Sequence, residues 1–181
     1  MDALEMLNND HRMVEQLFRD YEAAKSDNQR RGVVEIAIRE LSKHAALEEL
    51  MVYPLAKEAI SDGEQEIDHH LDEHMAVKKT LVALDKAGND QEQTSQLMAT
   101  LQKEIDEHVQ DEEEGLWPKL RQAVEQEALD ELGKVLDEAK KVAPTRPHPA
   151  APTEPPKLAL AAPVAALYDR VRDRFQKRPQ T

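Results

Sequence analysis

Histidine and glutamate recur at a spacing of four residues in this sequence. Three such pairs stand out, together with one further histidine near the start of the chain: His44 and Glu48, His108 and Glu112, His70 and His74, and His11. Residues four apart lie about 40° from each other around an α-helix, so both side chains of a pair face the same way. Imidazole and carboxylate ligands are typical of sites for iron, manganese or zinc. We therefore expect a metal site.

The apolar pattern places these residues on the inward faces of four predicted helices. Leucine, isoleucine, valine and phenylalanine recur in phase with the histidines and glutamates in each segment. A single histidine in such a stripe is more often a core residue than a ligand, but here five histidines and two glutamates share the stripes. Burying two carboxylates beside neutral imidazoles is costly unless they coordinate a cation. The set therefore predicts a dinuclear metal site.

The sequence repeats itself with a shift of 64 residues. The segment His44-Ala-Ala-Leu-Glu-Glu, followed by Tyr53-Pro54, matches His108-Val-Gln-Asp-Glu-Glu, followed by Trp117-Pro118. In each half a further histidine precedes this segment, by 33 residues in the first half (His11) and by 34 in the second (His74). The first two helices should therefore be related to the next two by an approximate two-fold axis.

His70 has no counterpart in the first half, and this makes the predicted site asymmetric. One metal can be surrounded by three histidines, His70, His74 and His108. The other metal can be reached by two, His11 and His44. If Glu48 and Glu112 bridge the metals together with an oxygen from solvent, the second metal has one ligand fewer. An open position is therefore expected at the metal held by His11 and His44, where O2 or peroxide could react.

Four long helices and a shorter fifth one are predicted. Their expected ranges are Ala3 to Ala24, Gln29 to Tyr53, Glu64 to Ala87, Gln91 onward, and Leu129 to Val142. Alanine, leucine, glutamate and lysine favour helix throughout, and no alternating β-branched run indicates a strand. Pro54 and Pro118 should kink or weaken their helices. The short connections predict an all-α, up-down-up-down four-helix bundle.

The composition changes after Val142. Residues 144–163 contain seven prolines, which is typical of an extended, semi-rigid linker. An apolar stripe with a basic opposite face then predicts a short terminal helix: Val164, Leu167, Tyr168, Val171 and Phe175. We therefore divide the chain into a bundle, residues 1–143, and a tail, residues 144–181. The tail helix is expected to pack on the bundle or on a second subunit, which would make a homo-oligomer.

The charge and the missing cysteines narrow the function classes. The net charge is -13, and the tail has seven basic and three acidic residues, so the first 143 residues carry -17. Such an acidic body repels phosphate backbones, and no nucleic-acid partner is expected. Without cysteine there are no disulfides and no thiolate ligands. The start has no secretory pattern, and the longest apolar stretch is about half of a membrane span. We expect a cytoplasmic protein without membrane contact.

The spaced ligand set, with the Tyr53-Pro54 and Trp117-Pro118 endings, resembles the hemerythrin HHE cation-binding family over about residues 1 to 140. The resemblance implies a hemerythrin-like bundle holding two iron ions, bridged by carboxylates and an oxo or hydroxo group. Oxygen carriers of this family place an acid five residues after the last histidine, which would select Glu113. Glu113 lies about 140° from His108 around a regular helix, so we expect Glu112 to bridge unless the helix bulges.

The resemblance implies chemistry with O2, hydrogen peroxide or nitric oxide as a small ligand. We expect a stand-alone protein that reacts with O2 or peroxide, with catalase-like peroxide decomposition as one outcome. The alternative is non-enzymatic, reversible binding of O2 or nitric oxide, or sensing of iron or oxygen. Whether the protein is an enzyme stays open on the sequence.

Other readings concern residues at the margin of the set. His70-Leu-Asp-Glu73-His74 also fits the H-x-x-E-H signature of a class of zinc proteases, in which the glutamate is a general base. Such a protease would need a substrate-aligning strand and would bind one zinc. Surface or supporting positions are expected for the remaining polar candidates: His69, His148, Glu49, Glu113 and Glu114. Tyr53 and Trp117 are expected to pack in the core.

Overall fold

The computed structural model describes residues 1–150 and residue 171, and the secondary structure in this part of the chain is entirely helical. Its elements are α1 (Ala3–Ala23), α2 (Asp27–Leu47), the π-helical turn η1 (Glu48–Val52), α3 (Tyr53–Ala59), α4 (Gly63–Ala87), α5 (Gln91–Asp111), the π-helical turn η2 (Glu112–Leu116), α6 (Trp117–Ala123) and α7 (Gln126–Lys140). The prediction of an all-α protein is confirmed for these residues.

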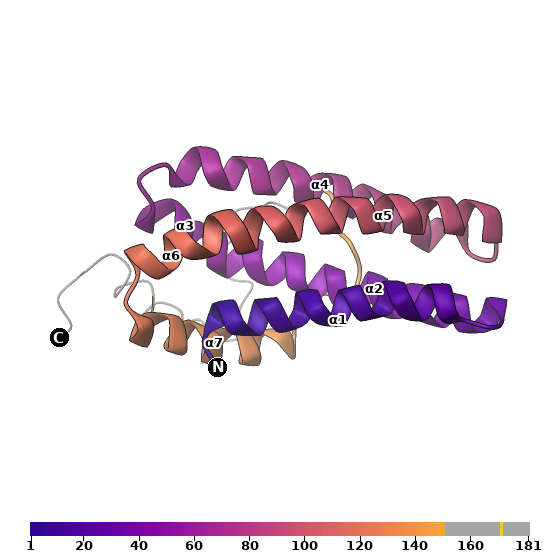
Figure 1. The fold of residues 1–181 in the computed structure, drawn as a ribbon, viewed down its shortest axis with the longest axis horizontal. Helices are drawn as coiled ribbons and strands as arrows, with labels where there is room; N and C mark the ends of the chain where they lie inside the picture. The colour runs from indigo at the N-terminus through magenta and orange to yellow at the C-terminus, as the bar shows by residue number, and fades with distance from the viewer. Residues whose placement is uncertain (151–170, 172–181) are drawn as a thin grey trace.

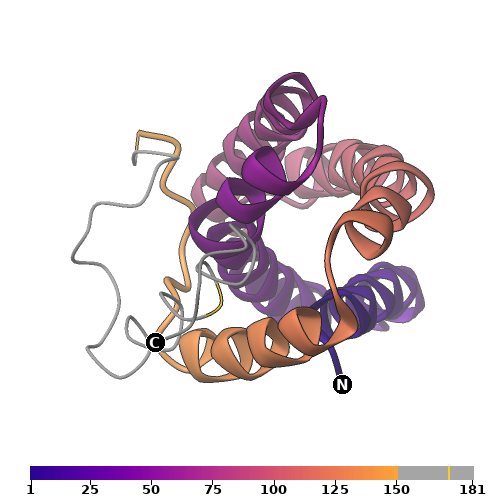
Figure 2. The same ribbon diagram turned by 90° about the vertical axis from the view of Figure 1, so that its left-hand side faces the viewer.

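Four long helices, α1, α2, α4 and α5, lie side by side and form the body of the molecule (Figure 1). Beyond the π-helical turns, α3 continues α2 and α6 continues α5, and we call each of the four long helices with any continuation a rod. α7 packs against α1 and α2 on the outside of this body, as the end-on view shows (Figure 2). The helical bundle is thus extended by a fifth helix, close to the range expected for it.

Local signals in the sequence set the helix ends. Asp2 caps α1, since its side chain accepts from the Glu5 backbone N–H while the Glu5 side chain accepts from the Asp2 backbone N–H. Ser26 and Asp90 cap α2 and α5 through their side chains. Gly88 ends α4 with φ of 56°, a conformation that costs glycine little. These signals explain why the predicted helix starts agree with the structure within a few residues.

The two prolines do not end their helices. A proline lacks the N–H that would bond to the carbonyl four residues earlier, and its ring crowds that carbonyl. In η1 the Tyr53 N–H bonds to the Glu48 carbonyl five residues earlier, and in η2 the Trp117 N–H bonds likewise to the Glu112 carbonyl. The wider turn accommodates the proline that follows. Both helical rods therefore extend to Ala59 and Ala123, past the end near Tyr53 that was expected for the second helix.

Two apolar clusters fill the interior. The first includes residues of α1, α4 and α7 such as Leu4, Ile67 and Leu136, and the second lies further along α1, α2, α4 and α5, with Phe18 and Leu101 among its members. In each of the four rods the predicted ligand residues lie near the point in the sequence where the members of one cluster give way to those of the other. The ligand candidates therefore form a polar layer between two apolar layers.

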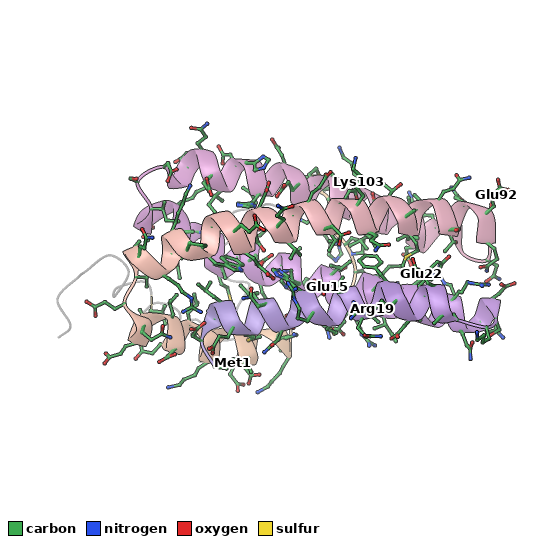
Figure 3. The ribbon with its side chains drawn as sticks, viewed as in Figure 1. Met1, Glu15, Arg19, Glu22, Glu92 and Lys103 are labelled. Carbon is green, nitrogen blue, oxygen red and sulfur yellow. The ribbon has the colours of Figure 1, made fainter. Side chains whose placement is uncertain are left out.

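Charged side chains cover the outside of the helices. Arg19 and Glu22 of α1 and Glu92 and Lys103 of α5 are exposed on the outer faces of the bundle (Figure 3). Among the described residues, no helix combines the length and the apolar composition that a bilayer crossing requires.

Most of the predicted tail lies outside the described residues. The linker prediction for 144–163 can be followed only to residue 150, and the predicted terminal helix falls outside the described residues except for Val171. Val171 is buried and packs in the first apolar cluster. The boundary between residues 143 and 144 stays a prediction.

Candidate metal centre

The polar layer brings together all seven residues singled out in the sequence. They come from six elements, α1, α2, η1, α4, α5 and η2, and each is at most 5% exposed: His11, His44, Glu48, His70, His74, His108 and Glu112. Their donor atoms form three groups in which all ligand atoms lie within 4.8 Å of one another: His11, His44, Glu48 and Glu112; Glu48, His74 and His108; and His70, His108 and Glu112.

Four of the histidines form two pairs. The Nε2 atoms of His11 and His44 are 3.2 Å apart, and those of His74 and His108 are also 3.2 Å apart. The first pair connects α1 with α2, and the second connects α4 with α5, in agreement with the internal repeat. The geometry therefore offers two neighbouring positions at which Nε2 atoms converge.

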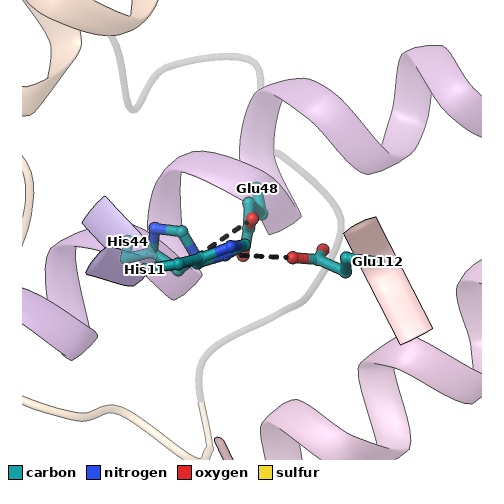
Figure 4. Close-up of side chains that lie close together, drawn as sticks. All are labelled: His11, His44, Glu48 and Glu112. Carbon is teal, nitrogen blue, oxygen red and sulfur yellow. Dashed lines mark hydrogen bonds and ion pairs between the residues drawn. The ribbon is translucent and has the colours of Figure 1, made fainter. Parts of the chain in front are cut away.

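The two glutamates lie between the pairs. Glu48 Oε1 is 3.1 Å from His44 Nε2, and Glu48 Oε2 is 3.3 Å from His74 Nε2. Glu112 Oε2 is 3.3 Å from His11 Nε2 and 3.4 Å from His108 Nε2. Figure 4 shows Glu48 and Glu112 beside His11 and His44. Each carboxylate is thus placed to contact cations on both sides.

A second set of carboxylates holds the outer nitrogens of the histidines. His11 Nδ1 lies 2.8 Å from Glu113, and His74 Nδ1 lies 2.9 Å from Glu49. These two contacts are equivalent in the internal repeat. A carboxylate accepts hydrogen bonds, so each of these Nδ1 atoms donates its hydrogen and Nε2 is directed into the layer.

The same arrangement recurs at the other histidines. Glu73 Oε2 is 2.9 Å from His108 Nδ1 and 3.1 Å from His70 Nδ1. Its counterpart Asp10 faces His44 Nδ1 at 3.7 Å. Through these contacts all five histidines present Nε2 to the centre.

Asp10 and Glu73 were missed as supporting residues in the sequence. The signal was present, because each directly precedes a predicted ligand, as Asp10-His11 and Glu73-His74. The partner of Asp10, however, is on another helix, and so is one of the two partners of Glu73. Three cations that hold supporting carboxylates were missed as well: Lys78 on Glu49, Arg12 on Glu113 and Lys140 of α7 on Asp10.

Tyr53 reaches the centre, whereas its repeat counterpart Trp117 turns away. The Tyr53 hydroxyl donates to Glu112 Oε1 at 2.8 Å and lies 3.0 Å from His74 Nε2. Trp117 instead donates to Asn8 at 2.9 Å. Both rings pack in the first apolar cluster, as expected, but the contact of the tyrosine hydroxyl was not foreseen. Burial and the carboxylates of Glu112 and Glu48 hold the Tyr53 pKa well above its usual range, so the hydroxyl keeps its proton.

The electrostatics of the layer favour cations. Burial would raise the pKa of Glu48, but His44 and His74 hold it well below its ordinary value. Burial would lower the pKa of His44, but Glu48, Asp10 and Glu112 raise it to about 10. In the same way Glu48 and Glu49 outweigh burial and raise the pKa of His74 to about 9. The carboxylates stay ionised, and positive charge among the histidines is stabilised.

The donor set fits a metal. Both oxygens of Glu48 and Glu112 Oε2 are buried and make no hydrogen bond within the described part of the chain, although histidine Nε2 atoms lie 3.1–3.4 Å away as ion-pair neighbours. A buried carboxylate oxygen without a donor is costly, and a coordinated cation removes this cost. Protons on the histidines can offset the charge when no metal is bound, and metal ions displace those protons on binding.

A helical bundle with a buried layer of histidines and glutamates defines a metal-binding bundle protein. The hemerythrin HHE cation binding domain matches residues 2–120, and the chain belongs to this family. An uncharacterized hemerythrin-like protein of Schizosaccharomyces pombe is 27% identical over 173 residues, which cover 94% of this chain and 84% of that protein. No solved structure matches the chain.

The two histidines of the pentapeptide from His70 to His74 belong to this larger buried layer. Glu73 is bonded to His70 and His108 and lies on their outer side, which leaves it no free position as a general base between two zinc ligands. The described residues also contain no strand that could align a peptide substrate. The geometry therefore favours the seven-residue layer over a zinc protease site.

Proposed function

We propose that this metal-binding protein holds two iron ions and reacts with O2 or hydrogen peroxide, with catalase-like decomposition of peroxide as one outcome. The proposed ligands are the seven residues of the layer: His11, His44, Glu48, His70, His74, His108 and Glu112. The observation that carries the proposal is the position of Glu48 and Glu112, each of which contacts a histidine of both pairs. We also propose that the three-residue connections at 24–26, 60–62 and 88–90 give the four rods an up-down-up-down order.

The ligand number is proposed to differ between the two ions. His70 groups with His108 and Glu112, which adds a third histidine on that side. The position equivalent to His70 in the first half is Leu7, a fully buried apolar residue that cannot coordinate. The ion held by His11 and His44 would therefore have one protein ligand fewer and would be the one that accepts the small ligand.

Iron would supply redox chemistry at this position, together with the bridging oxo or hydroxo group expected for the family. The chain itself excludes bulk water through the apolar layers on both sides and fixes four of the five imidazoles through hydrogen bonds at Nδ1, those of His11, His70, His74 and His108. The Tyr53 hydroxyl holds one oxygen of Glu112 and stays protonated. The complete burial of the layer restricts its reactants to molecules the size of O2, hydrogen peroxide or nitric oxide.

Sensing of oxygen or iron is the second candidate, and one contact favours it. Lys140 of α7 bonds to Asp10, and Asp10 faces the outer nitrogen of His44. A helix outside the four rods is thereby linked to the proposed open side of the centre. Reversible binding of O2 or nitric oxide would use the same site without turnover.

Iron content and reaction with peroxide test the proposal together. The iron-reconstituted chain is expected to hold about two irons, to absorb in the near ultraviolet, and to release gas rapidly on addition of peroxide. Reversible spectral change with O2 and no gas release would favour binding or sensing instead. Less than one iron per chain after reconstitution would contradict the di-iron proposal.

A further inference from the structure

Three metal-ligating side chains meet on the outer surface of α4 and α5, outside the buried layer. His69 Nε2 lies 3.1 Å from Asp111 Oδ2 and 3.4 Å from Glu73 Oε1. One donor atom from each residue lies within 4.8 Å of the other two. The side chains of His69 and Asp111 are 60% and 51% exposed, so solvent and dissolved ions reach this cluster. His69 and Glu73 are four residues apart on one helix and therefore point the same way.

The first half of the repeat has a different composition at the equivalent positions. Counterparts of His69 and Asp111 are Met6 and Leu47, which are buried in the apolar cluster that also contains α7 residues. Asp10 is the counterpart of Glu73 and accepts a bond from Lys140 of α7. In the first half, therefore, a carboxylate lies between a ligand histidine and an ammonium group supplied by the chain.

In the second half the same carboxylate lies between the ligand histidines and the surface cluster. Glu73 Oε2 is bonded to His70 and His108, which leaves Oε1 directed toward His69. No lysine or arginine is paired with Glu73 among the ion pairs of the described residues. Where Asp10 has the ammonium group of Lys140 beside it, Glu73 has the imidazole of His69 and the carboxylate of Asp111.

We propose that His69, Glu73 and Asp111 bind a divalent transition-metal ion, separate from the buried pair of ions. One imidazole and two carboxylates suit zinc, ferrous iron or manganese, and three protein ligands leave further positions to water. The bound ion would play the charge-balancing part that Lys140 plays in the first half. It would also draw on the carboxylate that holds the outer nitrogens of His70 and His108, and so connect the surface to the buried centre.

This proposal does not depend on the chemistry of the buried centre. The competing arrangement is a plain ion pair, in which a protonated His69 offsets the two carboxylates and no metal binds. The two arrangements differ in whether the removal of Asp111 changes the number of metal ions that the chain takes up.

Zinc binding to the full chain, first loaded with iron and then freed of loosely bound metal, tests the proposal. Asp111→Asn and His69→Ala remove surface ligands and leave the seven buried residues intact. Wild-type protein is expected to bind one zinc more per chain than either variant in equilibrium dialysis, or to bind it at least ten-fold more tightly in calorimetry. Asp106→Asn, an exposed aspartate on the same helix outside the cluster, is the matched control and should behave as the wild type.

Equal zinc uptake by wild type and both variants would overturn the proposal in favour of the ion pair. Iron is measured in every sample, because zinc that displaced buried iron would raise zinc uptake and lower iron content together. If the wild-type chain holds no iron at all, the di-iron proposal fails, and the difference of one zinc between wild type and Asp111→Asn still decides the surface site.

Discussion

Each histidine of the centre uses its two ring nitrogens for different partners. Nε2 points into the layer, and Nδ1 points to a carboxylate, which for every histidine except His70 lies on another element, such as Glu113 for His11 and Glu49 for His74. The two glutamates of each adjacent pair, Glu48-Glu49 and Glu112-Glu113, therefore have different contacts. Glu48 and Glu112 enter the layer, whereas Glu49 and Glu113 stand behind a histidine of the other half.

The separation of parts between Glu112 and Glu113 leads to the first prediction. Glu112→Gln replaces a fully buried anion between two histidine pairs by a neutral amide, and most of the bound iron should be lost. Glu113→Gln only weakens the support of His11, and metal affinity should fall roughly ten- to a hundred-fold. Iron content and metal titration of both variants measure the difference. An equal or greater loss in Glu113→Gln would mean that Glu113 is the ligand.

His70 should account for the asymmetry of the centre. His70→Ala removes the donor that groups with His108 and Glu112, so one iron should be bound more loosely and the spectrum should change. His69→Ala is the control for iron, since it removes the neighbouring exposed histidine. Unchanged iron content and spectrum in His70→Ala would exclude His70 as a ligand.

At the scale of elements, the π-helical turns and the caps position the site. Glu48 and Glu112 are the first residues of η1 and η2, where the backbone widens ahead of a proline. Consecutive side chains of a helix point about 100° apart, so Glu48 and Glu112 face the layer while Glu49 and Glu113 face His74 and His11. Asp2, which caps α1, also accepts hydrogen bonds from Arg121 of α6 and Gln126 of α7. Its side chain therefore connects α1, α6 and α7.

Asp2 should stabilise the fold in a pH-dependent way. Burial would raise its pKa, but bonds from Arg121, Gln126 and the Glu5 N–H lower it below the ordinary value of 3.8. A lowered pKa means that the stabilisation is present above pH 3.8 and is lost as the pH falls through the folded-state pKa. Asp2→Ala should lower the free energy of unfolding by about 1–2 kcal/mol at pH 7.

Chemical denaturation at several pH values measures this effect. The gap between wild type and Asp2→Ala should narrow in acid, below pH 3.8. Asp137→Ala, an exposed aspartate of α7, serves as the control and should change stability little. A gap that is independent of pH would mean that the Asp2 charge contributes nothing.

At the scale of the molecule, the bundle carries the centre and the C-terminal part covers its first apolar cluster. α7 packs on α1 and α2, and Val171 is buried in the same cluster. None of the seven proposed ligands comes from this part of the chain. The apolar face expected for the tail is covered at the one position that the structure describes.

Truncation after Val142 should therefore separate stability from metal binding. Iron content and spectrum should be retained, while the midpoint of thermal unfolding falls. Burial of a valine side chain alone contributes about 1.5 kcal/mol or more. Val171→Ala in the full chain should shift the midpoint in the same direction by a smaller amount. A truncated chain that cannot hold iron would place the tail within the core of the bundle.

The sequence by itself determined the starts of the helices within a few residues, the inward phase of the seven residues and the relation of the two halves. These features follow from the 3.6-residue period of the helix and from capping residues within a few positions of each end, so they are local. For the same reason the absence of a counterpart to His70 in the first half could be predicted from the repeat alone. Family membership, borne out by the match over residues 2–120, also rested on these spacings.

Only the tertiary structure decided which atoms meet. His11 and Glu113 are 102 residues apart, and their contact depends on how α1 packs beside η2, which no local pattern specifies. Tyr53 and Trp117 occupy equivalent positions, yet the Tyr53 hydroxyl donates to Glu112 and the Trp117 ring N–H donates to Asn8. The docking of α7 on α1 brings Lys140 to Asp10 and leaves Glu73 facing solvent-exposed His69 and Asp111. Packing breaks the symmetry that the repeat carries, since a fifth helix can cover only one side of the bundle.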